Sequence, residues 1–291
     1  MAVLIRNLSQ IATPRGVRSV SGAAMRDIVI VEKAAIVIRD GRIAFAGRES
    51  EIDDALRAEI DDDVDAGGAT AIPGFVDSHT HLPFAGSRES EFNRRLHGES
   101  YEEIAATGGG ILSTVHATRA ASEEELTTIV LARTATMAAH GTTTAEAKSG
   151  YGLTTPSELR QLRAIRAASE TSPVRLVPTC LAAHEFPPES RNSEAARDRW
   201  LSAIVEEVLP AVAEENLALF CDAFVERGVF TRAQGERILR AATAHGMTPR
   251  LHADEFSDSD GAALAVELSA ASADHLMYVS DAGIKALAQS D

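Results

Sequence analysis

The chain has 291 residues, of which 45% are hydrophobic, and carries a formal net charge of −15 at pH 7. This length predicts one large domain with a substantial core beside a small one, and the acidic balance argues against nucleic acid or a membrane surface as a partner. Two cysteines within apolar runs (Cys180 and Cys221), no apolar run of membrane-spanning length and no signal-peptide pattern at the N-terminus indicate a cytoplasmic protein with buried thiols.

Residues 1–72 predict a small β-rich, sandwich-like domain. Strand-like stretches lie at residues 29–31, 35–39 and 43–46. Asp40 and Gly41 form a typical hairpin turn between the last two of these stretches. An acidic segment and a pair of glycines follow, so we expect the small domain to end just before Pro73.

From Pro73 onward, strand-like and helix-like stretches alternate. The strand candidates are residues 75–76, 141–146, 174–179, 217–225, 249–252 and 272–276. Helix starts are marked at Ser122 with Glu125, at Thr155 before Pro156, at Thr231 with Gln234, and at Ser280. Such alternation predicts a parallel sheet, and polar residues after the strands favour a barrel over an open sheet. A (β/α)8 barrel needs eight units, so we expect an incomplete barrel of about six over residues 73–291.

The first strand of this region ends in two histidines, His79 and His81, with one residue between them. Residues two apart on a strand point to the same side, so both imidazoles can converge on one point. Two converging imidazoles form half of a metal site. The alternative is a pair of surface histidines on a loop.

His252 and Glu255 follow the fifth strand. His252 is a candidate third metal ligand, and Glu255 is a candidate general base beside a metal-bound water, whose pKa a divalent ion lowers toward ~7. The alternative is a helix N-cap at Asp254 with Glu255 as an ordinary first-turn charge. His275 ends the sixth strand and is a candidate to polarise a substrate carbonyl, or else a structural histidine.

Other residues are candidates to contact a substrate. Arg88 lies seven residues past His81 and can bind a carboxylate with both arms of its guanidinium. Tyr151 sits on a glycine-flanked loop after the second strand, and His184 follows the third. The fourth strand contains no lysine, so a single metal is favoured over a pair held by a modified lysine.

Taken together, these segments resemble the imidazolonepropionase family, which belongs to the amidohydrolase superfamily and acts in histidine degradation. The resemblance is carried by residues 73–82, 84–89, 108–111, 142–153, 183–188, 252–255 and 272–276, and so covers nearly the whole chain. The segments Lys-Ser-Gly-Tyr-Gly-Leu (148–153) and Gly-Ser-Arg-Glu (86–89) are specific to this family within the superfamily.

The resemblance implies a TIM-like metal-dependent hydrolase barrel that hydrolyses 4-imidazolone-5-propanoate to N-formimidoyl-L-glutamate with one zinc or iron ion, as a homodimer. By position, the metal ligands would be His79, His81 and His252, and the catalytic residues Glu255 and His275. The substrate would be held by Arg88, Tyr101, Tyr151, His184 and Glu255.

The family continues through two more strand–helix units, which supply an aspartate ligand and then complete the small domain. We therefore expect the chain by itself to be weakly active or inactive. Two alternatives stay open: an aromatic-base deaminase of the same superfamily, and a non-catalytic metal-binding remnant. Arg88 favours the hydrolase, because a neutral base offers a guanidinium no carboxylate to bind.

Overall fold

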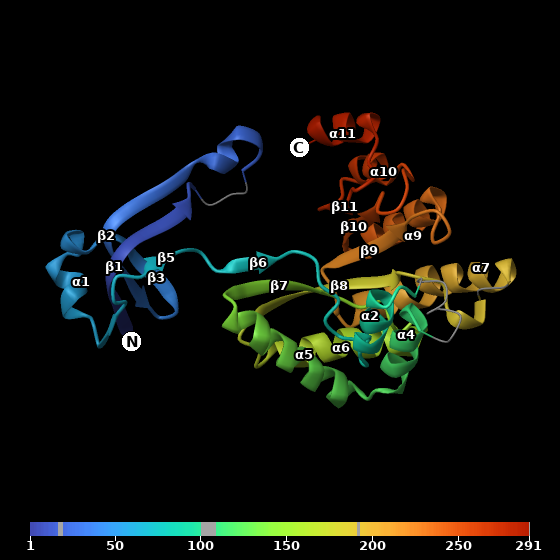
Figure 1. Ribbon diagram of the computed structural model, residues 1–291, viewed down its shortest axis with the longest axis horizontal. Coiled ribbons are helices and arrows are strands. Elements are labelled where there is room, and N and C mark those ends of the chain that lie inside the picture. The colour runs from blue at the N-terminus through green and yellow to red at the C-terminus, as the bar shows by residue number, and fades with distance from the viewer. Residues whose placement is uncertain (17–19, 100–108, 191–192, 291) are drawn as a thin grey trace. The chain divides into compact units, whose positions relative to one another are not determined.

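The computed structural model describes residues 1–16, 20–99, 109–190 and 193–290, so Tyr101 lies outside the described residues. The chain divides into two compact units, Met1–Gly74 and Phe75–Asp291 (Figure 1). Within the described ranges, the helices are all too short or too polar to cross a lipid bilayer.

The first unit contains a five-stranded mixed sheet. Its strands are β1 (Ala2–Pro14), β2 (Ile28–Arg39), β3 (Arg42–Arg48), β4 (Asp62–Asp65) and β5 (Thr70–Ala71), with short helical segments η1 (Gly22–Arg26), η2 (Glu49–Glu51) and α1 (Asp54–Ala58). β1 pairs antiparallel with β2 and parallel with both β4 and β5. The predicted hairpin turn joins β2 to β3, with φ of 53° at Asp40 and 73° at Gly41. A sandwich-like domain over residues 1–72 stays a prediction.

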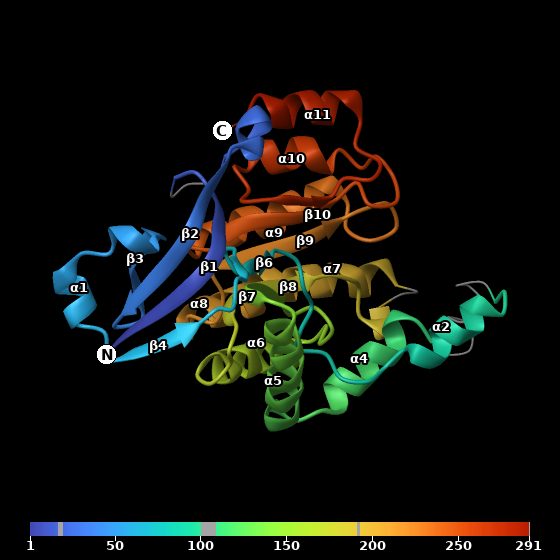
Figure 2. The ribbon, with the colours of Figure 1, turned by 60° about the vertical axis from the view of Figure 1, so that its left-hand side comes forward.

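The second unit is built on a six-stranded parallel sheet in which every strand lies beside its neighbours in sequence. The strands are β6 (Phe75–Asp77), β7 (Thr142–Lys148), β8 (Arg175–Ala183), β9 (Phe220–Val225), β10 (Thr248–Ala253) and β11 (Ala273–His275). The sheet curls, with helices on its outer side (Figure 2). This arrangement confirms the predicted incomplete barrel.

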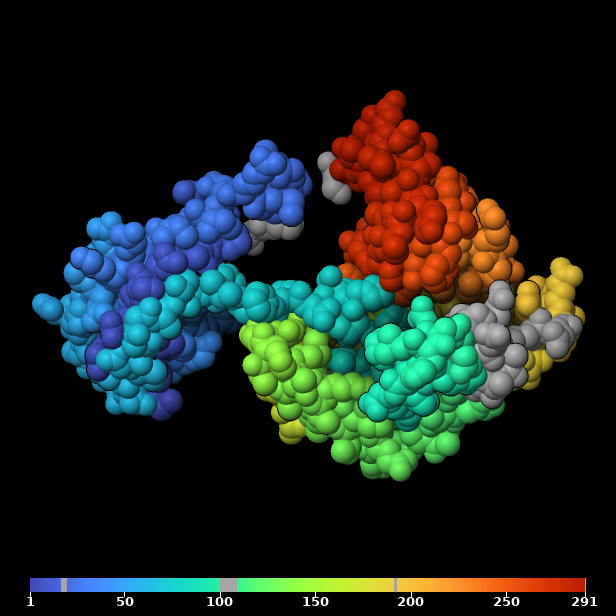
Figure 3. All heavy atoms as spheres, in the orientation of Figure 1, coloured from blue at the N-terminus to red at the C-terminus, as the bar shows by residue number. Residues whose placement is uncertain are grey.

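Helices connect these strands. They are α2 (Glu89–Leu96), α4 (Ile111–Ala120), α5 (Glu123–Ala139), α6 (Thr155–Ser169), η3 (Pro188–Ser190), α7 (Glu194–Ala203), the π-helical turn η4 (Ile204–Val208), α8 (Leu209–Glu214), α9 (Arg232–Ala244), α10 (Gly261–Glu267) and α11 (Asp281–Ala288). Figure 3 shows the orange-to-red C-terminal elements on one side of this unit and the green helices α4 and α5 on the other.

Local signals set most of the helix starts. Capping boxes open α5 at Ser122 and α9 at Thr231, as predicted, and the side chain of Ser280 caps α11. The predicted cap of α6 was one residue too late, because the side chain of Thr154, and not that of Thr155, accepts the hydrogen bond from the Ser157 backbone.

The core of the second unit lies between the sheet and its helices. Leu162 and Ile165 of α6 and Ile238 of α9 are completely buried there. α9 packs so closely on β9 that a Cβ at Gly235 would lie 2.5 Å from Cγ2 of Val225. This packing fixes the position of β9, whose Asp222 is important for the site. The thiols of Cys180 and Cys221 are buried, as predicted.

Candidate metal centre and substrate pocket

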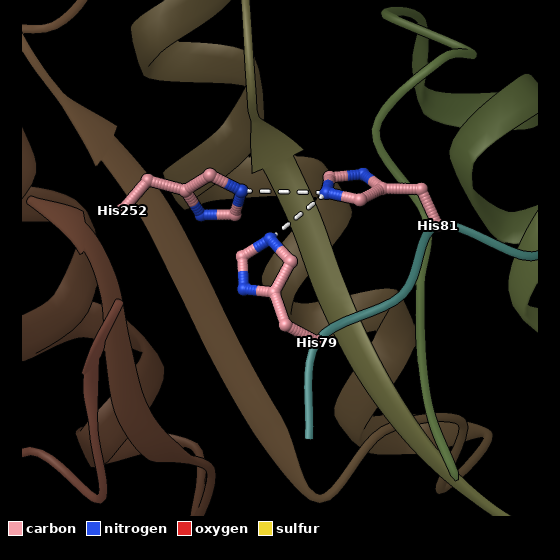
Figure 4. A group of neighbouring side chains, drawn as sticks. All are labelled: His79, His81 and His252. Carbon is pink, nitrogen blue, oxygen red and sulfur yellow. Dashed lines mark hydrogen bonds between the residues drawn. The ribbon is translucent and has the colours of Figure 1, made fainter. Parts of the chain in front are cut away.

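Three imidazoles meet at the carboxyl ends of β6 and β10 (Figure 4). Nε2 of His81 lies 3.3 Å from Nε2 of His79 and 3.4 Å from Nε2 of His252. Two nitrogens bound to one ion at about 2.0–2.1 Å, in tetrahedral geometry, are about 3.3–3.4 Å apart. The structure therefore brings the three predicted ligands together at the spacing that a single ion requires, and they form a potential metal-binding group.

Two of these rings are oriented by carboxylates on their other nitrogen. Nδ1 of His79 is hydrogen-bonded to Oδ2 of Asp274 at 2.8 Å. Nδ1 of His252 lies 2.9 Å from Oδ2 of Asp222, an ion-pair contact, and the backbone N–H of His252 donates to the other oxygen of that carboxylate. A carboxylate beside Nδ1 keeps the proton on that atom, so Nε2 carries a lone pair that can bind a metal ion. Three lone pairs directed at one point repel one another, and a cation between them removes that repulsion. The donor set therefore fits a divalent metal ion.

Burial also keeps His81 in the form that binds metal. Its removal from water, and then the nearby rings of His184 and His252, hold the pKa of His81 well below its usual value. The imidazole is therefore neutral at pH 7. Its Nδ1 is a buried polar atom without a hydrogen-bond partner within the described part of the chain.

Glu255 and His275, the predicted catalytic pair, lie side by side. Glu255 follows β10 and His275 ends β11, and Oε2 of the first is 3.6 Å from Nε2 of the second. Partial burial raises the pKa of Glu255. Burial, together with the neighbouring rings of His252 and His79, lowers the pKa of His275 to about 4. A neutral imidazole therefore stands next to a carboxylate that is a stronger base than usual.

A cavity of about 620 Å³ lies next to His81 and His252, whose rings adjoin that of His184 in its lining. It is lined by Arg88, Arg95, Ile111, Tyr151, His184, Glu185, Phe224, Val229 and Phe256. The predicted substrate residues Arg88, Tyr151 and His184 thus share one cavity, and the ring centroids of His184 and His81 are 4.9 Å apart. Arg95 and the apolar part of the lining were not predicted, because nothing in the local sequence distinguishes them from ordinary helix and core residues.

The loop that carries Tyr151 is held from beneath by Glu158 of α6. This fully buried carboxylate accepts hydrogen bonds from the backbone N–H groups of Gly150, Gly152 and Leu153, at 3.0, 2.8 and 2.8 Å. Glu158 stands in the first turn of α6. The structure shows that it also shapes the loop on which the cavity depends.

The same loop fixes the protonation of His184. Its Nδ1 lies 2.9 Å from the carbonyl oxygen of Gly150. A carbonyl oxygen only accepts, so Nδ1 carries the proton and Nε2 is left as an acceptor. Burial, and then the nearby His252, lower the pKa of His184 to about 3, so the ring is neutral at pH 7.

Asp222, like Asp274, belongs to the candidate site but was not predicted from the sequence. It stands alone among apolar residues in the stretch 217–225, and it is completely buried. Buried carboxylates are rare unless they are paired, so a single aspartate in an apolar strand is a signal that could have found it. Burial alone would raise the pKa of Asp222, but His252 and Lys148 hold it well below the usual value.

Curated relatives match almost the whole chain. An imidazolonepropionase from Symbiobacterium thermophilum is 52% identical over 270 residues, which cover 92% of this chain and 63% of the relative. One from Myxococcus xanthus is 48% identical over 290 residues, covering 99% of this chain and 68% of the relative. One from Porphyromonas gingivalis is 45% identical over 293 residues, which cover 100% of this chain and 68% of the relative. The chain thus spans about two thirds of the length of these relatives, and no family model matches it.

Solved structures share the fold at low sequence identity. A guanine deaminase from C. acetobutylicum has a TM-score of 0.59 at 12% identity, covering 99% of this chain and 66% of that chain. A 5-methylcytosine deaminase from Klebsiella pneumoniae has a TM-score of 0.58 at 18% identity, covering 92% of this chain and 55% of that chain. An ochratoxinase from A. niger has a TM-score of 0.56 at 14% identity, covering 99% and 63%. Identities this low show the architecture alone.

Proposed function

The chain belongs to the imidazolonepropionase family, and from this membership we propose that it hydrolyses the ring amide of 4-imidazolone-5-propanoate to N-formimidoyl-L-glutamate. The observation that carries the proposal is the position of Arg88, which lines the cavity beside the three imidazoles. A guanidinium in a largely apolar cavity suits a small ring with a carboxylate tail.

We assign His79, His81 and His252 as the protein ligands of one divalent ion, either zinc or iron, since imidazole binds both. When bound, such an ion lowers the pKa of water toward ~7 and polarises a carbonyl oxygen. Each of the three rings would bind the ion through its Nε2 atom. The carboxylates of Asp222 and Asp274 keep two of those rings in the required tautomer.

Glu255 transfers protons in the reaction, and His275 donates a hydrogen bond to the substrate. The Glu255 carboxylate takes a proton from the attacking water and returns it to the ring nitrogen that leaves. Its pKa, raised by burial, makes both transfers easier at neutral pH. His275 is neutral, because its pKa is about 4, and it donates a hydrogen bond to the carbonyl oxygen as negative charge develops there.

The remaining residues hold the substrate. Arg88 binds the propanoate, and the phenol of Tyr151 contacts the ring. Nε2 of His184 accepts a hydrogen bond from a ring N–H, since Nδ1 already donates to Gly150. Tyr101 is proposed as a further contact from outside the described residues. We also propose that the protein works in the cytoplasm as a homodimer.

The test uses the purified chain with zinc or iron added. Calorimetry measures binding of 4-imidazolone-5-propanoate, and chromatography measures the N-formimidoyl-L-glutamate formed. We expect binding that depends on Arg88, and at most slow formation of product, which depends on both the metal and Glu255. Ammonia released from guanine or cytosine would point instead to a deaminase, and a chain that binds neither metal nor substrate would contradict the proposal.

A further inference from the structure

A buried lysine lies behind the three imidazoles. Lys148 is the last residue of β7, and its side chain is completely buried. The other two lysines of the chain, Lys33 and Lys285, are exposed. Burial alone would lower the pKa of Lys148, but Asp222 and Glu146 raise it, so the ammonium stays charged.

Three carboxylates from three strands surround this ammonium. Nζ of Lys148 lies 2.6 Å from Oδ2 of Asp222 in β9, 2.8 Å from Oε2 of Glu146 in β7 and 3.6 Å from Oδ2 of Asp274 in β11. The contact with Asp222 is a hydrogen bond, and those with Glu146 and Asp274 are ion pairs. Glu146 has further partners, because Arg250 forms an ion pair with it and Thr179 donates to it at 2.6 Å.

Two of the carboxylate oxygens near the ammonium also touch the metal-binding rings. Oδ2 of Asp222 is the atom 2.9 Å from Nδ1 of His252, and Oδ2 of Asp274 is the atom 2.8 Å from Nδ1 of His79. The ammonium of Lys148 therefore contacts both carboxylates that orient the metal-binding rings, Asp222 in β9 and Asp274 in β11.

We propose that Lys148 is a positioning residue for the metal centre: it holds the two carboxylates that orient His79 and His252. This inference rests on the metal centre assigned above. Without the ammonium, the carboxylates lose the cation that holds them together, and repulsion between them would move Asp222 and Asp274 away from the two rings. Each ring would then lose the contact that sets the orientation needed for metal binding.

The chemistry of this position favours lysine over arginine. An ammonium is a compact charge that can sit among three oxygens, whereas a guanidinium is planar and forms a broad fork. The described interior leaves Lys148 no exposed surface into which a larger head group could extend. Charge and size together therefore set the residue type.

The test measures metal affinity, which does not depend on turnover. Zinc binding to the purified 291-residue chain and to its Lys148→Met variant is measured by competition with a coloured chelator. Urea unfolding of the metal-free proteins shows that each is folded. We expect zinc affinity to fall about 10- to 100-fold, the range typical of losing a partner that orients a metal ligand. The visible spectrum of bound cobalt should also change, because the geometry of the ligands changes.

Two further variants make the result specific. Lys148→Gln keeps a hydrogen-bond donor without the charge, and it serves if the methionine variant does not fold. Leu162→Ala is the control, because it truncates a completely buried side chain of α6 and leaves Lys148 and its carboxylates unchanged. We expect that control to lose stability and to keep its zinc affinity.

The outcomes separate this inference from the function proposed above. If the unaltered chain binds no zinc, the proposed metal centre is wrong. If the unaltered chain binds zinc and a folded Lys148 variant binds it equally tightly, with the same cobalt spectrum, the positioning role is wrong. An equal loss of zinc affinity in the Leu162→Ala control would also overturn that role, because the effect would then come from general destabilisation.

Discussion

Nδ1 of His79 lies 2.8 Å from Oδ2 of Asp274, although the two residues are 195 positions apart in the chain. His79 follows β6, at one edge of the six-stranded sheet, and Asp274 lies in β11, at the other edge. The two edges of a flat six-stranded sheet would be about 24 Å apart, at roughly 4.8 Å per strand. The hydrogen bond is therefore possible only because the sheet curls as a barrel does.

Asp274→Asn tests the importance of this contact. The amide oxygen can still accept the hydrogen bond from Nδ1, but the negative charge is lost, so the ring is oriented less firmly. We expect zinc affinity to fall about 10-fold, with little change in the free energy of unfolding. Chelator competition gives the affinity, and the exposed first-turn residue Asp281, changed to Asn, is the matched control. An unchanged affinity would show that Asp274 does not orient His79.

The two arginines of the cavity should differ in their effect on substrate binding. Both arginines are exposed and line the same cavity, but Arg88 lies next to Tyr151, whose burial-raised pKa it partly offsets. A charged hydrogen bond contributes about 1.5–3 kcal/mol, so Arg88→Met should weaken binding of 4-imidazolone-5-propanoate about 10- to 150-fold. Arg95→Met should weaken it less. Calorimetry decides, and equal losses would mean that Arg88 has no special role.

Glu158→Gln should loosen the loop that carries Tyr151. A glutamine has one acceptor oxygen, and its amide group would face backbone N–H donors, so at least one of the three hydrogen bonds to the loop is lost. Leaving a buried donor without a partner costs about 1–3 kcal/mol in the free energy of unfolding. Urea denaturation measures this loss, and substrate affinity should fall with it. A variant as stable as the unaltered chain would contradict the structural role of Glu158.

Stability of the metal-free chain should fall in mild acid. The pKa of His184 is about 3 in the folded chain, against a usual value of 6.5, so the unfolded chain takes up the proton first as the pH falls. The His184 contribution is therefore constant above about pH 6.5 and decreases below it, by up to about 1.4 kcal/mol per pH unit.

Other buried histidines act in the same direction, so a variant is needed to isolate this one. Urea denaturation at several pH values from about 7 down to about 5 should show a shallower dependence on pH for His184→Gln than for the unaltered chain. Equal slopes would mean that His184 does not stay neutral in the folded state.

Much of the fold follows from short-range sequence signals. Ser122 with Glu125 and Thr231 with Gln234 set helix starts through bonds within four residues, and regular strand–helix alternation gave the parallel order of the sheet. Adjacent threonines made the start of α6 ambiguous by one residue, because either one precedes Pro156 closely enough to act as a cap.

The histidines of the candidate metal centre could also be found from sequence, because the spacing of His79 and His81 is a local property of one strand end. The lone Asp222 in an apolar strand can be noticed from sequence, but its partners cannot. Pairing of β9 with β10 brings its carboxylate to His252, and Lys148 reaches it from β7. Such contacts depend on register between strands that are far apart in the chain, and no short sequence window contains that information.

The two histidines that follow β6 depend on a strand with a single neighbour within the described sheet, since β6 pairs with β7 alone. Edge strands exchange their amide hydrogens faster than central ones because they open by local unfolding. A cation held by His79 and His81 on one side and His252 on the other would oppose that opening. Adding zinc should therefore slow hydrogen exchange in β6 far more than in the central strand β8. In this way metal binding would stabilise the edge strand of the barrel against local unfolding.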